Sequence, residues 1–420
     1  MQQSVEPDIR KGAPQCERRA SPEIAAHPRA VELRESLSRA RNVAVISKFR
    51  YMGDTIVATP FFSQLRSCLP DATITLITAP SVAEALRNCP HIDCFVPLEL
   101  RGVSRWKHSL RVLGAIRYAR PEAVFLLDRS LRAAIISVLA GIPLRIGYTN
   151  EFRGPLLSAP IPYHFDRNEV DCHLDMLRIL GMPAQPALPE LWITGEERQR
   201  ALEVLAEQGF TPSSRPLIGL QPGANDPGVK EWGAARYAAV ANRIADELNG
   251  RIVMMGGAAE RRTADATYRT MRRDAIDLVA RLDLRTALAV IGVCDLWIGN
   301  DTGLLHAAVA QRVPSVGLFV PRSAVRFGYD TARHRTLVAP QHEASEARSL
   351  RTKSREGRRR LDAITESMVL AAAREVFSAS ESEPLPCTCG ADVQCAGPPF
   401  YAARNSNAPG RDMHRTGPGN

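Results

Sequence analysis

The chain has 420 residues, and its 54 Lys and Arg against 45 Asp and Glu give a formal charge of +9. Apolar residues make up 45% of the sequence and charged residues 24%, which excludes a mainly disordered, collagen-like or coiled-coil chain. The length predicts two or three domains. The longest uncharged apolar stretch, residues 133–143, is far shorter than the roughly 20 residues of a membrane span, and the polar N-terminus carries no apolar signal segment. We therefore expect a soluble cytoplasmic protein.

The first predicted domain covers residues 42–182 and follows an N-terminal extension, residues 1–41, in which only a short helix over 32–41 is expected. Short apolar runs alternate here with helical stretches, which is typical of βαβ units in a parallel sheet. The strands are expected at 43–46, 72–77, 94–96, 123–127 and 144–147, and the helices at 54–69, 81–88, 110–119, 131–140 and 169–180.

A second series of the same kind follows a Pro-rich linker region, residues 183–215. Its strands are expected at 216–220, 251–255, 277–279, 295–298 and 315–319, and its helices at 233–248, 260–272, 284–293 and 302–310. This C-terminal domain covers 216–377, and the tail at 378–420, rich in Pro, Gly, Ser and Asn, is expected to be disordered. The predicted fold class is α/β, with two doubly wound, Rossmann-like domains facing a central cleft in which a ligand binds.

A loop that contains Gly53 and Asp54 follows the first strand, at the sheet edge where ligand loops gather in parallel sheets. Asp54 suits two roles, the N-cap of the following helix or a general base that faces the cleft. The single glycine excludes the G-x-G-x-x-G pattern of dinucleotide binding.

The irregular loop at 221–230 of the second domain ends in Lys230, just before a helix. A lysine at this place can neutralise a phosphate leaving group, and a plain solvated lysine is the alternative.

Gly-Asn-Asp-Thr-Gly-Leu-Leu-His at 299–306 carries a strand into a helix of small residues. The free N–H groups and the dipole at the helix start suit a diphosphate, which Gly303 allows to approach closely. Asp301 would instead accept hydrogen bonds from sugar hydroxyls. His306 is interpreted as a hydrogen-bonded supporting or core histidine rather than a catalytic one.

Together, Met-Gly-Asp-Thr at 52–55, the Pro-Gly loop with Lys230 and the 299–306 motif resemble glycosyltransferase family 9, the ADP-heptose heptosyltransferases, in order and spacing. The resemblance spans about residues 42–340. It implies the two-domain GT-B fold and an inverting, metal-independent transfer of heptose from ADP-heptose to an acceptor hydroxyl. For most members the acceptor is the lipopolysaccharide inner core on lipid A, at the inner face of the cell membrane.

The resemblance also implies a role for individual positions. Asp54 corresponds to the general base, Lys230 to the residue that stabilises departing ADP, and Asp301 to the heptose ligand. The remaining donor-binding positions are Thr302, Gly303, Leu304, His306 and Glu260, the last at the place where family members hold the adenosine ribose. Glu260 also fits as a carboxylate favoured in the first turn of a helix.

Arg129 and Arg132 follow a strand of the first domain and are assigned to an anionic acceptor, with surface arginines as the alternative. No metal or other cofactor is expected, because no Asp-x-Asp signature follows a strand. A basic run at 345–360, with seven Lys or Arg against two Glu, fits either a solvated surface or contact with anionic headgroups. Without interleaved aromatic residues it does not predict nucleic-acid binding.

Three alternatives stay open. The chain can be a GT-B transferase or epimerase that uses another nucleotide sugar, a heptosyltransferase acting on a protein or small molecule, or a catalytically silent nucleotide-binding protein. In the tail, Cys387, Cys389 and Cys395 are interpreted as incidental thiols, because a structural zinc site needs four ligands.

Overall fold

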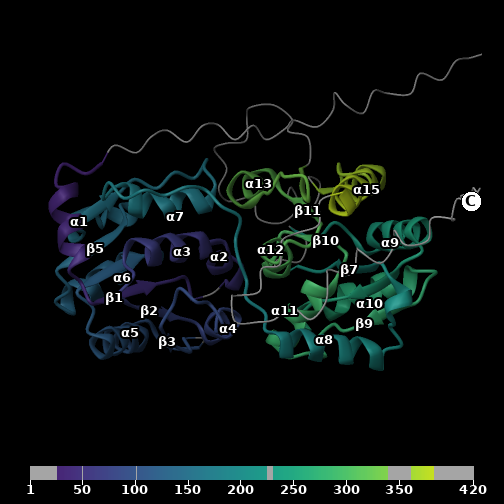
Figure 1. Cartoon of the computed structure of the whole chain (residues 1–420), viewed down its shortest axis with the longest axis horizontal. Helices are drawn as coiled ribbons and strands as arrows, with labels where there is room; N and C mark the ends of the chain where they lie inside the picture. The colour runs from purple at the N-terminus through teal and green to yellow at the C-terminus, as the bar shows by residue number, and fades with distance from the viewer. Residues whose placement is uncertain (1–25, 50, 101, 225–229, 339–360, 383–420) are drawn as a thin grey trace, which may run out of the picture.

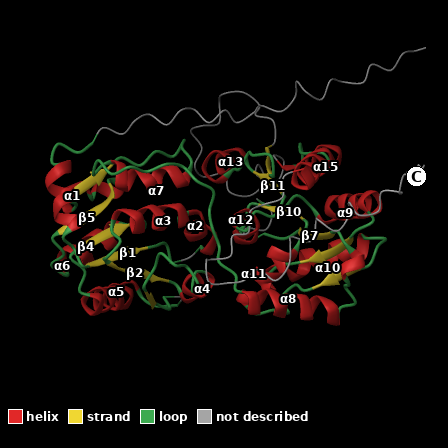
Figure 2. Ribbon diagram, viewed as in Figure 1, coloured by secondary structure: helices red, strands yellow, loops and turns green. Residues whose placement is uncertain are grey.

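The computed structural model describes residues 26–49, 51–100, 102–224, 230–338 and 361–382 (Figure 1). The helices and strands form an N-terminal half and a C-terminal half, which lie at the two ends of an elongated molecule (Figures 1 and 2). The predicted N-terminal extension up to residue 25, the basic run at 345–360 and the Cys-containing tail lie outside the described residues.

The N-terminal half holds a six-stranded parallel sheet in the order β3-β2-β1-β4-β5-β6. Its strands are β1 Asn42–Ile46, β2 Thr73–Thr78, β3 Cys94–Pro97, β4 Ala123–Leu126, β5 Leu144–Tyr148 and β6 Ala159–Ile161. Its helices are α1 Ala30–Ser38, α2 Met52–Val57, α3 Thr59–Cys68, α4 Pro80–Ala85, α5 Arg105–Ala119, α6 Leu131–Leu139 and α7 Glu169–Arg178, with 3-10 turns η2 Asn150–Phe152 and η3 Gly154–Leu156.

The C-terminal half repeats this design, with a six-stranded sheet in the order β12-β11-β10-β7-β8-β9. Its strands are β7 Leu217–Gln221, β8 Arg251–Met254, β9 Ala275–Asp277, β10 Leu296–Asn300, β11 Ser315–Phe319 and β12 His334–Val338. Its helices are α8 Gly195–Glu207, α9 Ala234–Leu248, α10 Arg261–Thr270, α11 Leu284–Val293, α12 Gly303–Ala310, α13 Pro321–Phe327 and α15 Glu366–Ser382, with 3-10 turns η4 Pro212–Ser214 and η5 Ala258–Glu260.

The strand register brings the functional loops together in each half. Ile46, the last residue of β1, pairs with Ile77 of β2 and Leu126 of β4, so the loops after these strands leave the sheet at one edge. In the second sheet Gly299 pairs with Gln221 of β7, and the loops that follow β7 and β10 are neighbours for the same reason.

Three apolar cores pack the helices against the two sheets. Helices α5 and α6 cover one face of the first sheet, and α9 and α15 cover one face of the second. The third core is continuous between the halves, because buried residues of α3 and α7 belong to the same cluster as those of α11 and α12.

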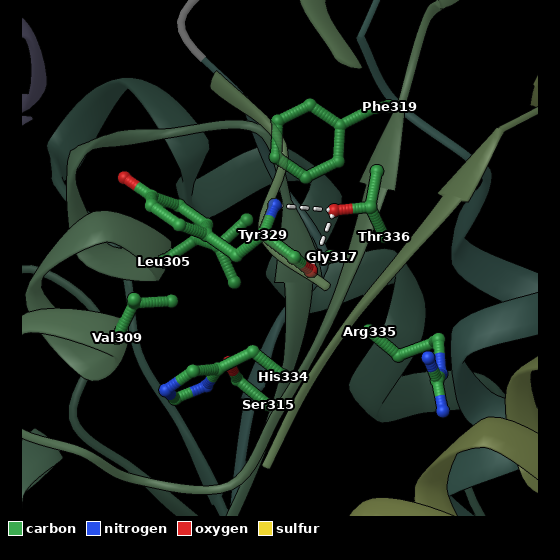
Figure 3. Close-up of a pocket in the computed structure, with 9 residues that line it drawn as sticks. All are labelled: Leu305, Val309, Ser315, Gly317, Phe319, Tyr329, His334, Arg335 and Thr336. Carbon is green, nitrogen blue, oxygen red and sulfur yellow. Dashed lines mark hydrogen bonds between the residues drawn. The ribbon is translucent and has the colours of Figure 1, made fainter. Parts of the chain in front are cut away.

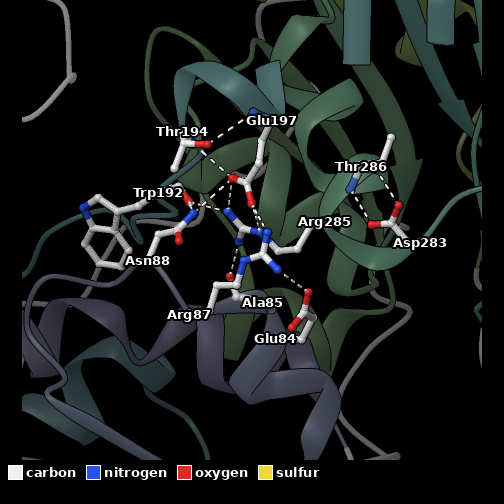
Figure 4. A network of polar contacts seen from close by, with 10 residues as sticks. All are labelled: Glu84, Ala85, Arg87, Asn88, Trp192, Thr194, Glu197, Asp283, Arg285 and Thr286. Carbon is white, nitrogen blue, oxygen red and sulfur yellow. Dashed lines mark hydrogen bonds and ion pairs between the residues drawn. The ribbon is translucent and has the colours of Figure 1, made fainter. Parts of the chain in front are cut away.

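A buried polar contact also joins the halves. Arg285 of α11 is 2% exposed, and its guanidinium donates hydrogen bonds to the carbonyl of Ala85 in α4, to the carbonyl of Trp192 and to the carboxylate of Glu197 in α8 (Figure 4). Burial alone would raise the pKa of Glu197, but hydrogen bonds from Arg285, from the backbone N–H of Thr194 and from Arg87 lower it to about 2. The N-terminal half, the connecting segment and the C-terminal half therefore meet at one arginine.

Several elements differ from the sequence expectations. The predicted 54–69 helix is two helices, because Pro60 in the first turn of α3 lacks the N–H that a continuous helix needs. Helix α8, with a capping box between Thr194 and Glu197, lies inside the segment expected to be a linker. Strands β6 and β12 and helices α13 and α15 were not predicted, and α15 reaches Ser382, beyond the expected start of the tail.

Candidate functional site

Asp301 lies at the carboxyl end of β10, where the chain turns into α12, and is 5% exposed. Its Oδ2 accepts hydrogen bonds from Nζ of Lys230, at 2.5 Å, and from the hydroxyl of Ser323. Nε2 of His306 lies 3.5 Å from Oδ1. Burial would raise the pKa of Asp301, but the contacts with His306 and Lys230 hold that pKa well below its usual range. Asp301 is thus a buried, charged acceptor of hydrogen bonds.

The start of α12 leaves backbone N–H groups available. Thr302 is the N-cap, but its side chain caps no helix N–H; its hydroxyl donates instead to Oε1 of Gln221 at 2.5 Å. Gly303 and Leu304 occupy the first turn, both half-exposed, and Leu304 packs against the shared apolar core. An uncapped helix start is a favourable place for an anion.

Glu260 ends η5 and is 7% exposed beneath the loop after β7. Its Oε1 accepts from Nε2 of Gln221 at 2.9 Å, and its Oε2 accepts from the backbone N–H of Gly257 at 2.6 Å. Burial raises the pKa of this carboxyl. Gln221 therefore joins Glu260 to Thr302 in one hydrogen-bonded row.

On the N-terminal side, Asp54 lies in the first turn of α2 and is not its N-cap, because that position belongs to Tyr51. The capping interpretation of Asp54 is therefore wrong. The carboxylate Oδ2 accepts a hydrogen bond from Nζ of Lys48 at 3.0 Å. Lys48 lies in the loop between β1 and α2 and is mostly buried.

Glu169, the first residue of α7, is the centre of the contacts around Asp54 and is fully buried. It accepts hydrogen bonds from Lys48 at 2.8 Å, from the Tyr163 hydroxyl at 2.5 Å and from Nη2 of Arg326 at 2.6 Å. Burial opposes its charge, but Lys48, His173 and Arg326 hold the pKa of Glu169 well below its usual range. Since Arg326 belongs to α13, this carboxylate also ties the two halves together.

Arg129 and Arg132 lie near the start of α6, and Arg129 borders this cluster. The guanidinium of Arg129 stacks over the ring of Tyr163, 4.4 Å from its centroid, and Nη1 of Arg129 is buried without a hydrogen-bond partner among the described residues. Arg132, in the first turn of α6, is half-buried; burial, with the charge of Arg132, lowers the pKa of His108. Arg129 is therefore more than a surface arginine.

The two sides meet where α2 packs on the first turn of α12. A Cβ on Gly53 would lie 2.7 Å from Cδ2 of His306 and 3.1 Å from Cα of Gly303, so only a glycine allows this approach. Burial, with the charges of both Asp301 and Asp54, raises the pKa of Tyr329 far above its usual value. Asp54 and Asp301 therefore act on the same buried hydroxyl from opposite halves of the molecule.

Tyr329 is held in place by strand β12 of the C-terminal sheet. Its backbone N–H donates to Oγ1 of Thr336 at 2.7 Å, beside a small cavity between α12 and strands β11 and β12 (Figure 3). Its hydroxyl lies 2.9 Å from Nδ1 of His306. This contact fixes the ring orientation of His306.

The sequence did not identify Lys48, Glu169, Arg326 or Tyr329 as part of the site. Lys48 carried a usable signal, because it lies between β1 and Asp54 in a ligand-loop position. Glu169 and Arg326 carried none, since their pairing joins residues 157 positions apart.

Among the residues that the structure describes, no group of three or more His, Cys, Asp or Glu could hold a metal ion. In the same part of the chain no helix is long and apolar enough to cross a membrane.

Comparisons with known proteins agree with the resemblance. The model of glycosyltransferase family 9 (heptosyltransferase) matches residues 109–357, more than half of the chain. Lipopolysaccharide heptosyltransferase 2 of Escherichia coli is 25% identical over 287 residues, which cover 65% of this chain and 81% of that protein. Lipooligosaccharide heptosyltransferase 2 of Haemophilus influenzae is 25% identical over 299 residues, which cover 67% of this chain and 84% of that protein.

Two solved structures share the fold. A family 9 glycosyl transferase from Veillonella parvula has a TM-score of 0.68 at 23% identity, covering 80% of this chain and 97% of its own. The ADP-heptose lipopolysaccharide heptosyltransferase II of E. coli has a TM-score of 0.66 at 22% identity, covering 81% and 99%. The predicted α/β class with two Rossmann-like domains of the GT-B type is confirmed. The chain is a glycosyltransferase and belongs to family 9, the heptosyltransferase family.

Proposed function

We propose that the protein transfers a heptose from ADP-heptose to a hydroxyl of an anionic acceptor, with inversion at the anomeric carbon and without a metal ion. The observation that carries this proposal is the approach of α2 to α12, which places the Asp54 side of the first sheet against the Asp301 and Gly303 end of the second. In this proposal residues 42–182 form the acceptor domain and residues 216–377 the nucleotide-sugar domain.

Asp54 would act as the general base that removes the proton from the acceptor hydroxyl. Lys48 holds the Asp54 carboxylate, and Glu169 in turn holds Lys48, so the base has a fixed orientation. Displacement at the anomeric carbon creates positive charge on the sugar, which a nearby carboxylate complements.

The leaving diphosphate would lie at the start of α12, against the N–H groups of Thr302, Gly303 and Leu304. Lys230 is paired with Asp301 in this structure, 2.5 Å apart, and is close enough to share its charge with the diphosphate. Asp301 would accept hydrogen bonds from the heptose hydroxyls, with His306 supporting it, and Glu260 would contact the adenosine ribose.

The acceptor side is cationic. Arg129 offers an unused, buried N–H group, and Arg132 lies three residues further along the chain. Because several relatives are lipopolysaccharide or lipooligosaccharide heptosyltransferases, we propose the inner core on lipid A as acceptor, reached from the cytoplasmic face by peripheral contact with the membrane. A phosphorylated protein or small molecule is the alternative acceptor.

The first test measures binding of ADP-, UDP- and GDP-sugars by thermal shift and calorimetry. A ligand that binds only the folded state stabilises it by about 2.7 kcal/mol at 100 times its Kd. Selective stabilisation by ADP-heptose is expected. Selective stabilisation by a uridine or guanosine sugar would overturn the donor assignment, and no response to any of them would favour a protein without transferase activity.

The second test concerns metal independence. With Lys230 and the start of α12 as the stabilisers of the leaving group, turnover should be unchanged by excess chelator. Complete loss on chelation, with recovery on addition of magnesium or manganese, would refute this part of the mechanism.

A further inference from the structure

Helices α5 and α6 lie side by side over one face of the first sheet and expose apolar side chains on their outward faces. In α5, Trp106, Leu110 and Tyr118 are all more than half exposed. Leu110 follows Trp106 by four residues, and Tyr118 follows Leu110 by eight. Such a spacing keeps all three on the solvent side of the helix. In α6, Leu139 is 63% exposed, next to the exposed Ile135 and Val138. We call these two outward faces the α5/α6 face.

This face holds half of the exposed large apolar side chains of the described residues. Of twelve such side chains, six belong to α5 and α6, and a seventh, Phe152, is 97% exposed in η2 beside the start of α6. Scattered single apolar residues are ordinary on a protein surface, whereas a contiguous group marks an interaction site.

Basic side chains surround the apolar ones. Helix α5 has the sequence RWKHSLRVLGAIRYA, with three Arg and one Lys besides its histidine, and no acidic residue. Nζ of Lys107 lies 5.5 Å from the ring centroid of Trp106. Arg111 donates to the carbonyl of Glu99, while the described residues supply no ion pair to Lys107 or Arg117. These charges therefore remain available to a partner.

We propose that the α5/α6 face docks on an anionic phospholipid bilayer. Trp and Tyr side chains favour the headgroup level of a bilayer, and Leu, Ile and Val side chains reach the boundary of the acyl chains. The negative surface potential of anionic lipids attracts each Lys or Arg near the surface and so strengthens binding. A second copy of the chain fits less well, because a two-fold contact would place two equally basic faces against each other. Nucleic acid fits less well because aliphatic side chains dominate α6.

The face also borders the proposed acceptor site. His108 of α5 packs edge-on against Phe49, at 5.7 Å between ring centroids, and Phe49 lies in the loop that leads from β1 into α2, the helix of Asp54. Docking through α5 would thus hold the acceptor side next to the bilayer, where a lipid-linked sugar presents its hydroxyl. This step deepens the proposed function and rests on it, but the docking itself is measured without donor or acceptor.

The experiment is co-sedimentation of the full chain with phosphatidylglycerol-containing vesicles and with pure phosphatidylcholine vesicles. The wild-type protein is expected to bind the anionic vesicles and not the neutral ones. The variant Trp106→Ser/Leu110→Ser removes two apolar contacts, and Lys107→Gln/Arg117→Gln removes two charges; each should weaken vesicle binding by about tenfold or more. The matched control, Tyr268→Ser/Arg269→Gln on the exposed side of α10, should bind as the wild type does.

Fluorescence gives an independent readout of the same contact. Of the four tryptophans, Trp232 and Trp297 are buried and Trp192 is half-buried, so Trp106 is the most exposed one. Anionic vesicles should shift its emission to the blue, and brominated lipid should quench it. Trp106→Phe should abolish this response while vesicle binding persists.

Full vesicle binding by both double variants would overturn the proposal and assign the attachment to another part of the chain. A dimer in the absence of lipid that Trp106→Ser/Leu110→Ser dissociates would overturn it in favour of self-association. Normal vesicle binding by a protein that fails to bind ADP-heptose would leave the docking face in place and refute only the proposed reaction.

Discussion

The Asp54 carboxylate is the residue on which the proposed chemistry depends most directly. We expect Asp54→Ala to lower kcat by about 10²–10⁴-fold, the usual contribution of a general base, while the Kd for donor stays unchanged. Steady-state kinetics and calorimetry measure the two quantities separately. Asp71→Ala, at an exposed position before β2, serves as the control and should behave as the wild type. A fully active Asp54→Ala enzyme would show that the base lies elsewhere.

Glu169 is predicted to act through Lys48 rather than on the substrate. Glu169→Gln keeps the shape of the side chain but leaves Lys48 and Arg326 facing a neutral amide in a buried place. The free energy of unfolding should fall by about 3 kcal/mol, as measured by urea denaturation. Glu35→Gln, which removes one partner of an exposed pair with Arg39, should change it by less than about 1 kcal/mol.

A purely structural role for Glu169 would change stability and not the pH profile. Because the variant removes a negative charge beside the Lys48–Asp54 pair, ionised Asp54 becomes more favourable. The acidic limb of the kcat/KM profile should therefore move to lower pH. An unchanged limb, with reduced stability alone, would restrict Glu169 to a structural role.

At the scale of elements, the contact between α2 and α12 depends on a missing side chain. Gly53→Ala places a Cβ against backbone and ring atoms that have no room for it, so we expect a loss of about 1–3 kcal/mol in stability and a lower kcat as α2 moves off α12. Gly114→Ala in α5 is the matched control, since a Cβ there meets nothing within 4 Å. It should stabilise the protein by about 0.5–1 kcal/mol. Equal effects of the two substitutions would contradict this account.

Arg285 provides the second element-scale contact between the halves (Figure 4). Arg285→Ala leaves the carbonyl of Ala85 without its side-chain donor, the carbonyl of Trp192 with Asn88 alone and Glu197 with fewer partners. We expect a loss of about 3–5 kcal/mol and faster proteolysis of the segment between α7 and α8. Arg285→Lys should rescue little, because an ammonium group cannot reproduce the forked contacts of a guanidinium. Wild-type protease resistance in Arg285→Ala would argue against a joining role.

Ten of the twelve strands, all except the edge strands β6 and β12, and the place of the ligand loops could be predicted from the sequence, because both follow from local patterns. The buried apolar run at 43–46 indicates a strand by itself, and the Gly-Asn-Asp-Thr-Gly segment at 299–303 indicates a turn from a strand into a helix. The partners of these residues could not be predicted in the same way. Glu169 looked like an ordinary acidic residue in a first helix turn, and only the packing of α7 against α13 shows that it is buried and paired with Arg326.

At the scale of the whole molecule, two buried histidines make stability depend on pH. Burial lowers the pKa of His173 to about 4 and that of His334 to about 3, against about 6.5 in an unfolded chain. Below pH 6.5 the unfolded state therefore binds protons that the folded state does not, and stability falls as pH falls. Each such histidine contributes a slope of about 1.4 kcal/mol per pH unit.

The slope can be measured between pH 6.5 and 5, above the range in which Glu169, Glu197 and Asp301 lose their charges in the unfolded chain. The free energy of unfolding at each pH comes from urea denaturation. His334→Gln should lower the slope by about one histidine's share, because glutamine does not titrate. Any packing defect of the variant shifts the whole curve and leaves its slope unchanged, so the comparison isolates protonation. Identical slopes in the variant and the wild type would mean that His334 takes up its proton without unfolding, by opening the sheet edge at β12 locally.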